Sequence, residues 1–308
     1  MLKKINPALW SGRTDHLDNR ESFRYHQVVD FSNIASSPKT CAIIGFQCEE
    51  GVRRNNGRLG AAQAPDALRS ELAKLPWRAV EGQRLVDIGN IECQDSHLEQ
   101  AQQHLGDVVA ELLTKEITPI ILGGGHETAY GHYLGVRKFI GKEASLGIIN
   151  IDAHFDLRPY DEQSSSGTMF KQILDNGENT SYFVAGIQRY GNTQELFNRA
   201  DELGVAYLYE DDMDSLPEEL DQFISQHDFI FLTLCTDVLN AAFAPGVSAP
   251  SPFGLEPAVV RSIIQKVTSH DKTLSFDISE VNPTLDENNR TVRLGAYLVN
   301  EAIMGFLR

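Results

Sequence analysis

Short apolar segments recur along the chain, and each one is bounded by Gly, Asp or Asn. They cover residues 41–45, 85–89, 119–122, 146–151, 182–185, 229–234 and 274–278. Because these segments are apolar at successive positions and not only at alternate ones, they are typical of parallel strands that are buried on both faces. The pattern therefore predicts a mainly parallel sheet in the interior of the protein.

Between these segments, apolar positions recur every three or four residues, which indicates amphipathic helices. The clearest example is the stretch 96–116, where Leu98, Ala101, Leu105 and Val108 fall on one stripe. Similar spacing covers residues 65–75, 193–203, 217–226 and 256–267. Strands that alternate with helices predict a three-layer α/β/α fold, with helices on both faces of the sheet.

The first 40 residues are polar and show no clear periodicity, so we expect an irregular N-terminal lead-in over residues 1–40. No linker, repeat or low-complexity tract divides the remainder, which predicts a single domain over residues 41–308. The stretch 244–252 is rich in Pro, Gly and Ser, but it follows a strand directly and is interpreted as an ordered loop.

Acidic residues outnumber basic ones, 43 against 27 in 308 residues, which gives a formal net charge of −16. This surplus argues against a nucleic-acid partner, because such binding depends on phosphate neutralisation by Lys and Arg. We find no apolar run suited to a membrane span or a signal peptide, so we expect a cytoplasmic protein. The cysteines follow no disulfide pattern; they are Cys41, Cys48, Cys93 and Cys235.

Polar, chemically active residues follow several of the predicted strands, where ligands of parallel sheets bind. On an extended backbone Asp152, His154 and Asp156 point to one side, and so do Cys235 and Asp237. With His126, they bring carboxylates and imidazoles together, and a divalent cation or a bridged pair of cations would neutralise their charge. Oxygen ligands combined with two imidazoles favour Mn²⁺ over Zn²⁺.

Simpler interpretations exist for parts of this pattern. Gly123, Gly124 and Gly125 follow a strand, but the sequence does not continue as a phosphate-binding motif, so they do not predict a nucleotide site. His126 on its own would be interpreted as a core histidine. The prediction of a metal site depends on the cluster at 152–156 together with the further strand ends that supply the same chemistry.

Four segments resemble the ureohydrolase family of arginases, agmatinases and formimidoylglutamases. They are Gly-Gly-Gly-His at 123–126, Asp-Ala-His-Phe-Asp at 152–156, the run from Cys235 to Pro250, and Glu-Val-Asn-Pro at 280–283. The resemblance extends from about residue 43 to the C-terminus. It implies a binuclear Mn²⁺ centre held by His126, Asp152, His154, Asp156, the residue at 235 and Asp237. A hydroxide that bridges the ions would attack an amidine or guanidine carbon.

Two positions depart from the usual pattern of that family. Position 235 is Cys where the family has an aspartate; a thiolate can bind one ion but cannot bridge two with separate oxygens, which puts the second Mn²⁺ in doubt. A buried structural thiol is the alternative interpretation of Cys235. In addition, Ser166 precedes Gly167 where arginases and agmatinases carry a histidine, which argues against both of those activities.

Two carboxylates are assigned roles in catalysis. Glu280 is the residue expected to pair with the cationic head of the substrate, since a carboxylate accepts two parallel N–H bonds. Asp156 is a candidate to carry the proton to the leaving amine.

Recognition of the rest of the substrate is assigned to the basic segment 49–61, which follows the first long strand. Arg53, Asn55, Asn56 and Arg58 concentrate hydrogen-bond donors in an acidic protein, which suits a substrate carboxylate, although such a run is often only a solvated face. By resemblance to the formimidoylglutamase branch, Ser165, Ser166 and Gln188 join them. That branch hydrolyses N-formimidoyl-L-glutamate to L-glutamate and formamide in histidine degradation.

Three hypotheses follow. The first is Mn²⁺-dependent hydrolysis of formimidoylglutamate. The second is the same chemistry on another anionic substrate, such as 4-guanidinobutyrate, which releases urea. The third is a catalytically weak metal-binding relative, because of Cys235. The family resemblance also suggests a homo-oligomer.

Overall fold

The predicted strands are present in the computed structural model, which describes residues 2–31, 39–78, 80–160, 163–177 and 179–308. They belong to a nine-stranded sheet in the described part of the chain, in the order β1-β3-β2-β4-β9-β8-β5-β6-β7. The strands are β1 Leu2–Lys3, β2 Thr40–Gln47, β3 Arg84–Glu92, β4 Ile117–Leu122, β5 Leu146–Ile151, β6 Thr180–Ile187, β7 Ala206–Tyr209, β8 Phe229–Cys235 and β9 Thr273–Ser279. All pairings are parallel except that of β1 with β3.

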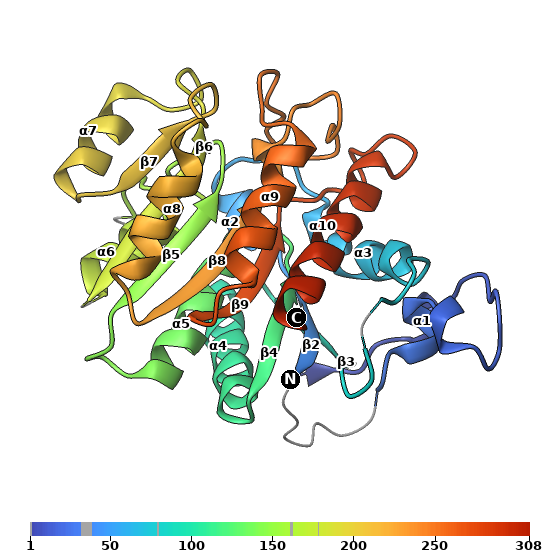
Figure 1. Cartoon of the computed structure of the whole chain (residues 1–308). Coiled ribbons are helices and arrows are strands. Elements are labelled where there is room, and N and C mark those ends of the chain that lie inside the picture. The colour runs from blue at the N-terminus through green and yellow to red at the C-terminus, as the bar shows by residue number, and fades with distance from the viewer. Residues whose placement is uncertain (1, 32–38, 79, 161–162, 178) are drawn as a thin grey trace.

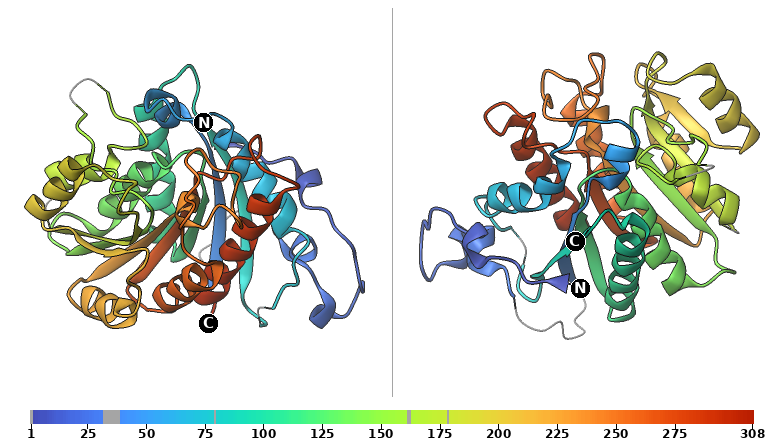
Figure 2. Two further views of the ribbon diagram at one scale, coloured as in Figure 1. Left: turned by 90° about the horizontal axis from the view of Figure 1, so that it is seen from above. Right: turned by 180° about the vertical axis from the view of Figure 1, so that it is seen from behind.

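Helices cover both faces of this sheet (Figures 1 and 2). Those whose apolar residues join one core are α3 Ala64–Leu72, α8 Leu216–Ser225, α9 Pro257–Thr268 and α10 Arg290–Phe306. Those of the other core are α4 Leu98–Thr114, α5 Thr128–Ile140, α6 Met169–Asn176 and α7 Gln194–Glu202. The three-layer α/β/α fold expected from the sequence is confirmed.

The strands divide their side chains between the two cores by simple alternation. On β2, Cys41 and Ile43 lie in the core with α3 and α10, whereas Ala42 and Ile44 lie in the core with α4 and α5. Both sets are fully buried. Because each strand is buried on both faces, its sequence is apolar throughout, which is the pattern that identified the strands.

The segment before residue 40 contains short elements: the 3-10 helices Pro7–Leu9 and Arg20–Ser22, and helix α1 Tyr25–Val28. Trp10 Nε1 donates a 2.7 Å hydrogen bond to Asp87 on β3, and the same carboxylate accepts two bonds from the buried Arg69 of α3. This network attaches the first residues to the sheet. The division at residue 40 stays a prediction, and residues 32–38 lie outside the described part.

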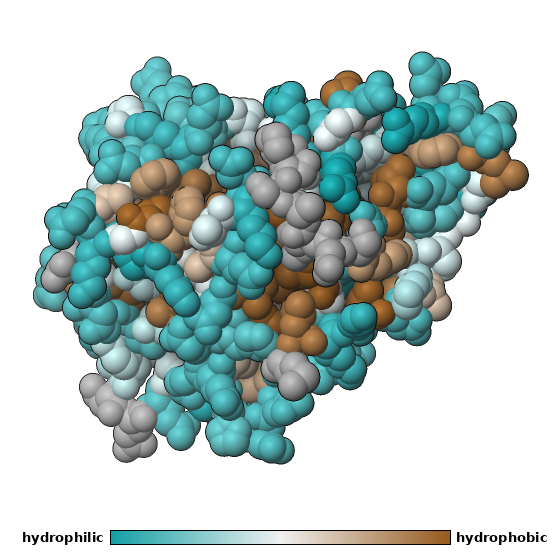
Figure 3. Space-filling model, turned by 90° about the horizontal axis from the view of Figure 1, so that it is seen from below, coloured by the Kyte–Doolittle hydropathy of each residue, from teal (hydrophilic) through white to brown (hydrophobic). Residues whose placement is uncertain are grey.

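None of the helices in the described ranges is long and apolar enough to cross a membrane. Seen from below, the molecule is mostly hydrophilic, with apolar side chains gathered toward the middle of the face (Figure 3).

The order of the strands in the sheet explains which chemically active residues come together. Strands β4, β9, β8 and β5 are consecutive neighbours, although they are far apart in the sequence. Because they run parallel, their carboxyl ends open onto one edge, where ligands of such sheets bind. All six residues predicted to bind metal lie at the ends of β4, β5 and β8 or in the segments that follow them.

Candidate active site

The candidate ion ligands converge from three strand ends, after β4, β5 and β8. They form two groups whose ligand atoms lie within 4.8 Å of one another: His126, Asp152 and Cys235 in one, and Asp152, His154 and Asp237 in the other. Asp152 belongs to both. The two groups together contain five of the six predicted ligands.

The carboxylate of Asp152 faces both imidazoles. Its Oδ2 lies 3.1 Å from His126 Nδ1, and its Oδ1 lies 3.6 Å from His154 Nδ1. Asp156 Oδ2, the sixth predicted ligand, lies 3.0 Å from His126 Nδ1, and Asp237 Oδ2 lies 3.2 Å from His154 Nδ1. Separations of about 3 Å are those of neighbouring ligand atoms on one octahedral ion, each about 2.1 Å from it.

The donor set therefore fits two divalent cations, and Asp152 is shared by the two groups that would hold them. One buried atom supports this independently: Asp237 Oδ1 has no hydrogen-bond partner among the described residues. A buried carboxylate oxygen without a partner is costly, and an ion would satisfy it. Carboxylate oxygens and imidazole nitrogens are ligands that suit Mn²⁺.

The charges of this cluster perturb one another strongly. Burial alone would raise the pKa of Asp152, but His126 and His154 hold it below its ordinary value. Burial would lower the pKa of both histidines, yet the neighbouring carboxylates raise it: Asp152 and Asp156 act on His126, and Asp237 and Asp152 act on His154. Buried carboxylates and imidazoles packed this closely favour a bound cation or proton among them.

Asp156 and Glu280, the two predicted catalytic carboxylates, share an unusual backbone conformation. Their φ angles are 51° and 68°, in the left-handed region that non-glycine residues rarely occupy. Burial and Asp152 raise the pKa of Asp156 to about 6. Burial, together with Glu127 and Asp237, raises the pKa of Glu280 to about 8. Both side chains line the same cleft.

The three glycines before His126 serve close packing between strands. A Cβ at Gly124 would lie 1.8 Å from the carbonyl oxygen of Cys48. The Gly125 N–H donates to that oxygen, at 2.9 Å, and the Gly124 carbonyl accepts from Glu280 N–H, at 2.8 Å. His126 N–H in turn donates to Glu280 Oε1, at 2.8 Å. The glycine loop thus connects the end of β2 to the segment after β9 and places His126 beside Glu280.

Cys235 ends β8 and is almost completely buried. Burial and the surrounding carboxylates raise the pKa of its thiol well above the ordinary value. Its Sγ nevertheless lies within the ligand group of His126 and Asp152, where a cation would favour the thiolate.

The cleft above the ligands has a volume of about 120 Å³. Besides the ion-binding groups and Glu280, polar side chains line its wall: Asn55, Arg158, Asn192, Ser166 and Ser248. Arg158 Nη1 donates to Asn55 Oδ1 at 3.1 Å, and Asn55 Nδ2 donates to Ser166 Oγ at 3.3 Å. Arg158 was not predicted, although it follows Asp156 by two residues, the spacing that placed His154 and Asp156 on one side.

Of the eight residues predicted to bind substrate, the cleft brings together Asn55, Ser166 and Glu280. Ser165 is buried beside Ser166, and its Oγ accepts a bond from Gly167 N–H, at 3.3 Å. Gln188 Nε2 donates to the carbonyl of Phe253, at 3.3 Å.

The arginines of the basic segment already have partners within the protein. Arg53 donates to Glu50 within helix α2 Glu50–Arg54, and its side chain is 55% exposed. Arg58 donates to the carbonyls of Val247 and Ser248, each at 2.9 Å, and so ties this segment to the 244–252 loop. Asn56 is exposed, with φ 58° at the end of α2. The substrate-binding role predicted for these residues stays a prediction.

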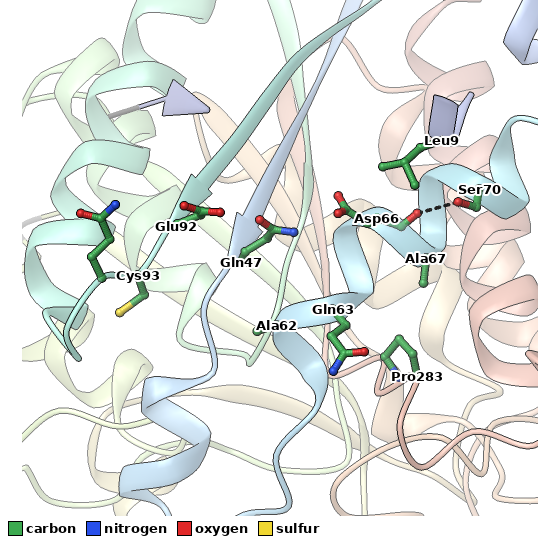
Figure 4. Close-up of a pocket in the computed structure, with 11 residues that line it drawn as sticks. Leu9, Gln47, Ala62, Gln63, Asp66, Ala67, Ser70, Glu92, Cys93 and Pro283 are labelled. Carbon is green, nitrogen blue, oxygen red and sulfur yellow. Dashed lines mark hydrogen bonds between the residues drawn. The ribbon is translucent and has the colours of Figure 1, made fainter. Parts of the chain in front are cut away.

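A second pocket, of about 680 Å³, lies beside the ends of β2 and β3 and helix α3 (Figure 4). Gln47, Glu92 and Cys93 line it from the strand ends, and Asp66 and Ser70 line it from α3. None of these residues belongs to either ion-binding group. Although this pocket is larger, the chemistry of the protein is concentrated in the smaller cleft.

Comparison with known proteins identifies the family of this chain. A model of the arginase family matches residues 39–305, which is most of the chain, so the chain belongs to the arginase family. It is 61% identical to the formimidoylglutamase of Lysinibacillus sphaericus (strain C3-41), over 100% of this chain and 98% of the relative. It is 49% identical to that of Geobacillus kaustophilus (strain HTA426), with the same coverage.

Solved structures resemble the whole fold. The crystal structure of formimidoylglutamase from Bacillus subtilis covers 95% of this chain and 94% of its own, with a TM-score of 0.85 at 24% identity. The crystal structure of Trypanosoma cruzi formiminoglutamase with Mn²⁺ covers 88% of this chain and 94% of its own, with a TM-score of 0.80 at 25% identity.

Proposed function

We propose that this protein is a Mn²⁺-dependent formimidoylglutamase, which hydrolyses N-formimidoyl-L-glutamate to L-glutamate and formamide. The observation that carries this proposal is the position of Arg158, which lines the cleft. The floor of the same cleft is formed by the two ion-binding groups, which share Asp152. The relatives named formimidoylglutamase at 61% and 49% identity support it. Hydrolysis of a guanidine such as 4-guanidinobutyrate is not favoured.

The residues that would hold Mn²⁺ are His126, Asp152, His154, Asp156, Cys235 and Asp237. Bound Mn²⁺ supplies a water nucleophile at neutral pH and stabilises the negative charge that develops as that nucleophile adds. Because Cys235 supplies a thiolate where a carboxylate would supply two oxygens, we expect the ion beside it to bind more weakly than the other.

Glu280 would bind the cationic amidine head of the substrate. Its carboxylate lies at the cleft, and one of its oxygens is oriented by the His126 N–H. The amidinium is planar and offers parallel N–H groups, which a carboxylate accepts in a bidentate pair. This contact holds the reacting carbon over the ion-binding groups and contributes orientation as well as affinity.

Asp156 would move the proton that the reaction requires. Hydrolysis adds water to the amidine carbon, breaks the bond from that carbon to the glutamate nitrogen, and leaves the nitrogen needing a proton. A carboxyl group on the cleft can accept a proton and then donate it to the leaving amine. Asp156 lines the cleft, which supports this role.

Arg158, Asn55 and Ser166 would bind the carboxylates of the glutamate tail. They come from two different loops and are joined by the hydrogen bonds from Arg158 to Asn55 and from Asn55 to Ser166. Arg53, Asn56, Arg58, Ser165 and Gln188 would then act around this group, either on the second carboxylate or by holding the loops in place. An anionic tail distinguishes this substrate from agmatine, and the absence of a histidine before Gly167 distinguishes the site from those of arginases and agmatinases.

We also propose that the enzyme is a homo-oligomer and acts in the cytoplasm. All four cysteines are free thiols in the structure, which suits a reducing compartment.

The test of the function is a substrate panel assayed with Mn²⁺-loaded protein. Formimidoylglutamate should be turned over with release of formamide, whereas 4-guanidinobutyrate, arginine and agmatine should give urea at least 100-fold more slowly or not at all. Preferred release of urea from any guanidine would overturn the assignment. The matched control is Asp152→Asn, which should lose Mn²⁺ and turnover together.

A further inference from the structure

A line of buried polar groups runs away from the cleft beneath His126. His126 Nε2 lies 3.1 Å from Thr233 Oγ1 on β8, and Thr233 donates a 2.8 Å hydrogen bond to Asp277 Oδ1 on β9. Asp277 Oδ2 lies 2.6 Å from Nδ1 of His132 on α5, and His132 Nε2 lies 2.5 Å from Ser275 Oγ. All five side chains are buried, with at most 1% exposure. We call this series the buried relay.

The position of the buried relay is not explained by substrate contact. Asp277 and His132 do not line the cleft, and neither belongs to an ion-binding group of the described residues. His132 packs against Phe231, with ring centroids 4.3 Å apart, in the interior of the sheet and helix layers. A buried ionisable pair is costly to desolvate and contributes little net stability compared with apolar residues of similar volume. Its presence therefore requires another explanation.

The directions of the hydrogen bonds explain why the buried relay is present. A threonine hydroxyl has one hydrogen, and Thr233 gives it to the carboxylate of Asp277, which can only accept. Toward His126, Thr233 can then only accept, so His126 carries its hydrogen on Nε2. In the neutral imidazole, the form that binds a metal, the free lone pair is then on Nδ1. That nitrogen faces Asp152 and Asp156, at 3.1 and 3.0 Å, where an ion would be held.

We propose that Thr233, Asp277 and His132 are positioning residues for metal binding: they fix the tautomer and orientation of His126. The inference rests on the Mn²⁺-dependent function proposed above and deepens it. A histidine that binds a metal through one nitrogen commonly donates from the other, and loss of that partner weakens metal binding by 10- to 100-fold. Here the partner is a hydroxyl whose direction is set by a buried carboxylate, which is held in turn by a second histidine.

The buried relay acts on one of the two ion positions. His126 belongs to the group that contains Cys235, whereas His154 belongs to the group with Asp237. The position beside Cys235 is the one expected to bind Mn²⁺ more weakly, because a thiolate replaces a bridging carboxylate. The relay therefore supports the ion that has the poorer donor set, and its loss should empty that position first.

The decisive experiment is a Mn²⁺ titration of Thr233→Val, with free Mn²⁺ measured by electron paramagnetic resonance. Valine keeps the shape of threonine and removes the hydroxyl. We expect one Mn²⁺ to bind with wild-type affinity and the other to bind at least 10-fold more weakly, with kcat reduced when only one position is filled. Thr233→Ser, which restores a hydroxyl, should recover most of the affinity.

The matched control is Thr273→Val. Thr273 is also a buried threonine of the same sheet, but its hydroxyl donates to the Val267 carbonyl at the opposite end of β9. This variant should bind both ions as the wild type does. If Thr233→Val does not fold, Asp277→Asn provides the same test, because its amide can donate to Thr233 and reverse the hydroxyl, and it should weaken the same ion.

The outcomes separate the relay from the proposed function. If the wild type binds two Mn²⁺ and hydrolyses formimidoylglutamate, but folded Thr233→Val or Asp277→Asn binds both ions with wild-type affinity, the relay is overturned and the function stands. Equal weakening in Thr233→Ser and Thr233→Val would also overturn the relay. If the wild type binds Mn²⁺ but releases no formamide, the function fails, and the metal titrations still decide whether the relay acts.

Discussion

Arg158 Nη1 donates a 3.1 Å hydrogen bond to Asn55 Oδ1 across the wall of the cleft. The two residues are 103 positions apart in the sequence, in loops that follow β5 and β2. Because both line the cleft, the bond preorganises a cationic donor and an amide donor for a shared acceptor. An anionic group of the substrate is the acceptor that this pair fits.

Arg158→Ala should raise KM for formimidoylglutamate about 10- to 100-fold, since a hydrogen bond to a charged group contributes about 1.5 to 3 kcal/mol. The tail is bound equally in the ground and transition states, so kcat should change little. Steady-state kinetics measure both quantities. Arg189→Ala is the control, because Arg189 stacks on Tyr209, outside the cleft. An unchanged KM in Arg158→Ala would mean that Arg158 does not bind the tail. The tail-binding role would then fall to Arg58, and Arg58→Ala should raise KM instead.

Glu280→Gln should reduce kcat/KM about 100-fold or more, because breaking a buried charge pair costs about 3 to 5 kcal/mol. The amide keeps the size of the side chain but cannot accept two N–H bonds from an amidinium. Mn²⁺ binding, measured by titration, should remain close to that of the wild type. A variant that keeps both its metal and its turnover would show that the amidine head binds elsewhere.

Cys235→Asp should tighten the weaker of the two Mn²⁺ ions about 10-fold or more, since it replaces a soft donor with a carboxylate able to bridge. Equilibrium dialysis against Mn²⁺ buffers measures the two affinities. Cys235→Ser, which adds no carboxylate, is the comparison and should not gain affinity. Identical binding curves for Cys235→Asp and the wild type would mean that the thiol does not contact an ion.

The metal-free protein should reveal the cost of burying Glu127. Burial raises the pKa of this carboxyl to about 7 from 4.5, so the folded protein keeps a proton that the unfolded chain releases in that range. The free energy of unfolding contributed by Glu127 therefore falls as pH rises from about 4.5 to 7, by about 3 kcal/mol. Glu127→Gln has no such proton. Urea unfolding at about pH 5 and about pH 8 should show a smaller loss in the variant, and equal losses would contradict this assignment.

The fold could be predicted from the sequence to a large extent, because strands buried on both faces have continuous apolar sequences. The strands β1 and β7 were not predicted. β1 has two residues, and β7 has four, of which Ala206 is exposed and Leu208 alone is buried. Neither carries enough consecutive apolar positions to distinguish it from a loop.

The candidate ion ligands could also be predicted, because Asp152, His154 and Asp156 follow one strand at two-residue spacing and the other ligands lie at the ends of further strands of the sheet. The chain that carries the three residues is not extended throughout, since Asp156 has a φ angle of 51°. Substrate recognition was harder to predict. The density of arginines in segment 49–61 indicated anion binding, but Arg53 pairs with Glu50 within one helical turn, and Arg58 reaches backbone carbonyls. The density of charge in a sequence does not show which arginine side chains already have partners, because the partners are set by contacts in the folded protein.

The most direct test of the central claim is a product balance on formimidoylglutamate, with the protein first stripped of metal and then reloaded with Mn²⁺. We predict no turnover without metal, and after reloading one formamide and one L-glutamate for each substrate consumed. Release of ammonia with N-formylglutamate, or turnover that does not require the metal, would contradict it.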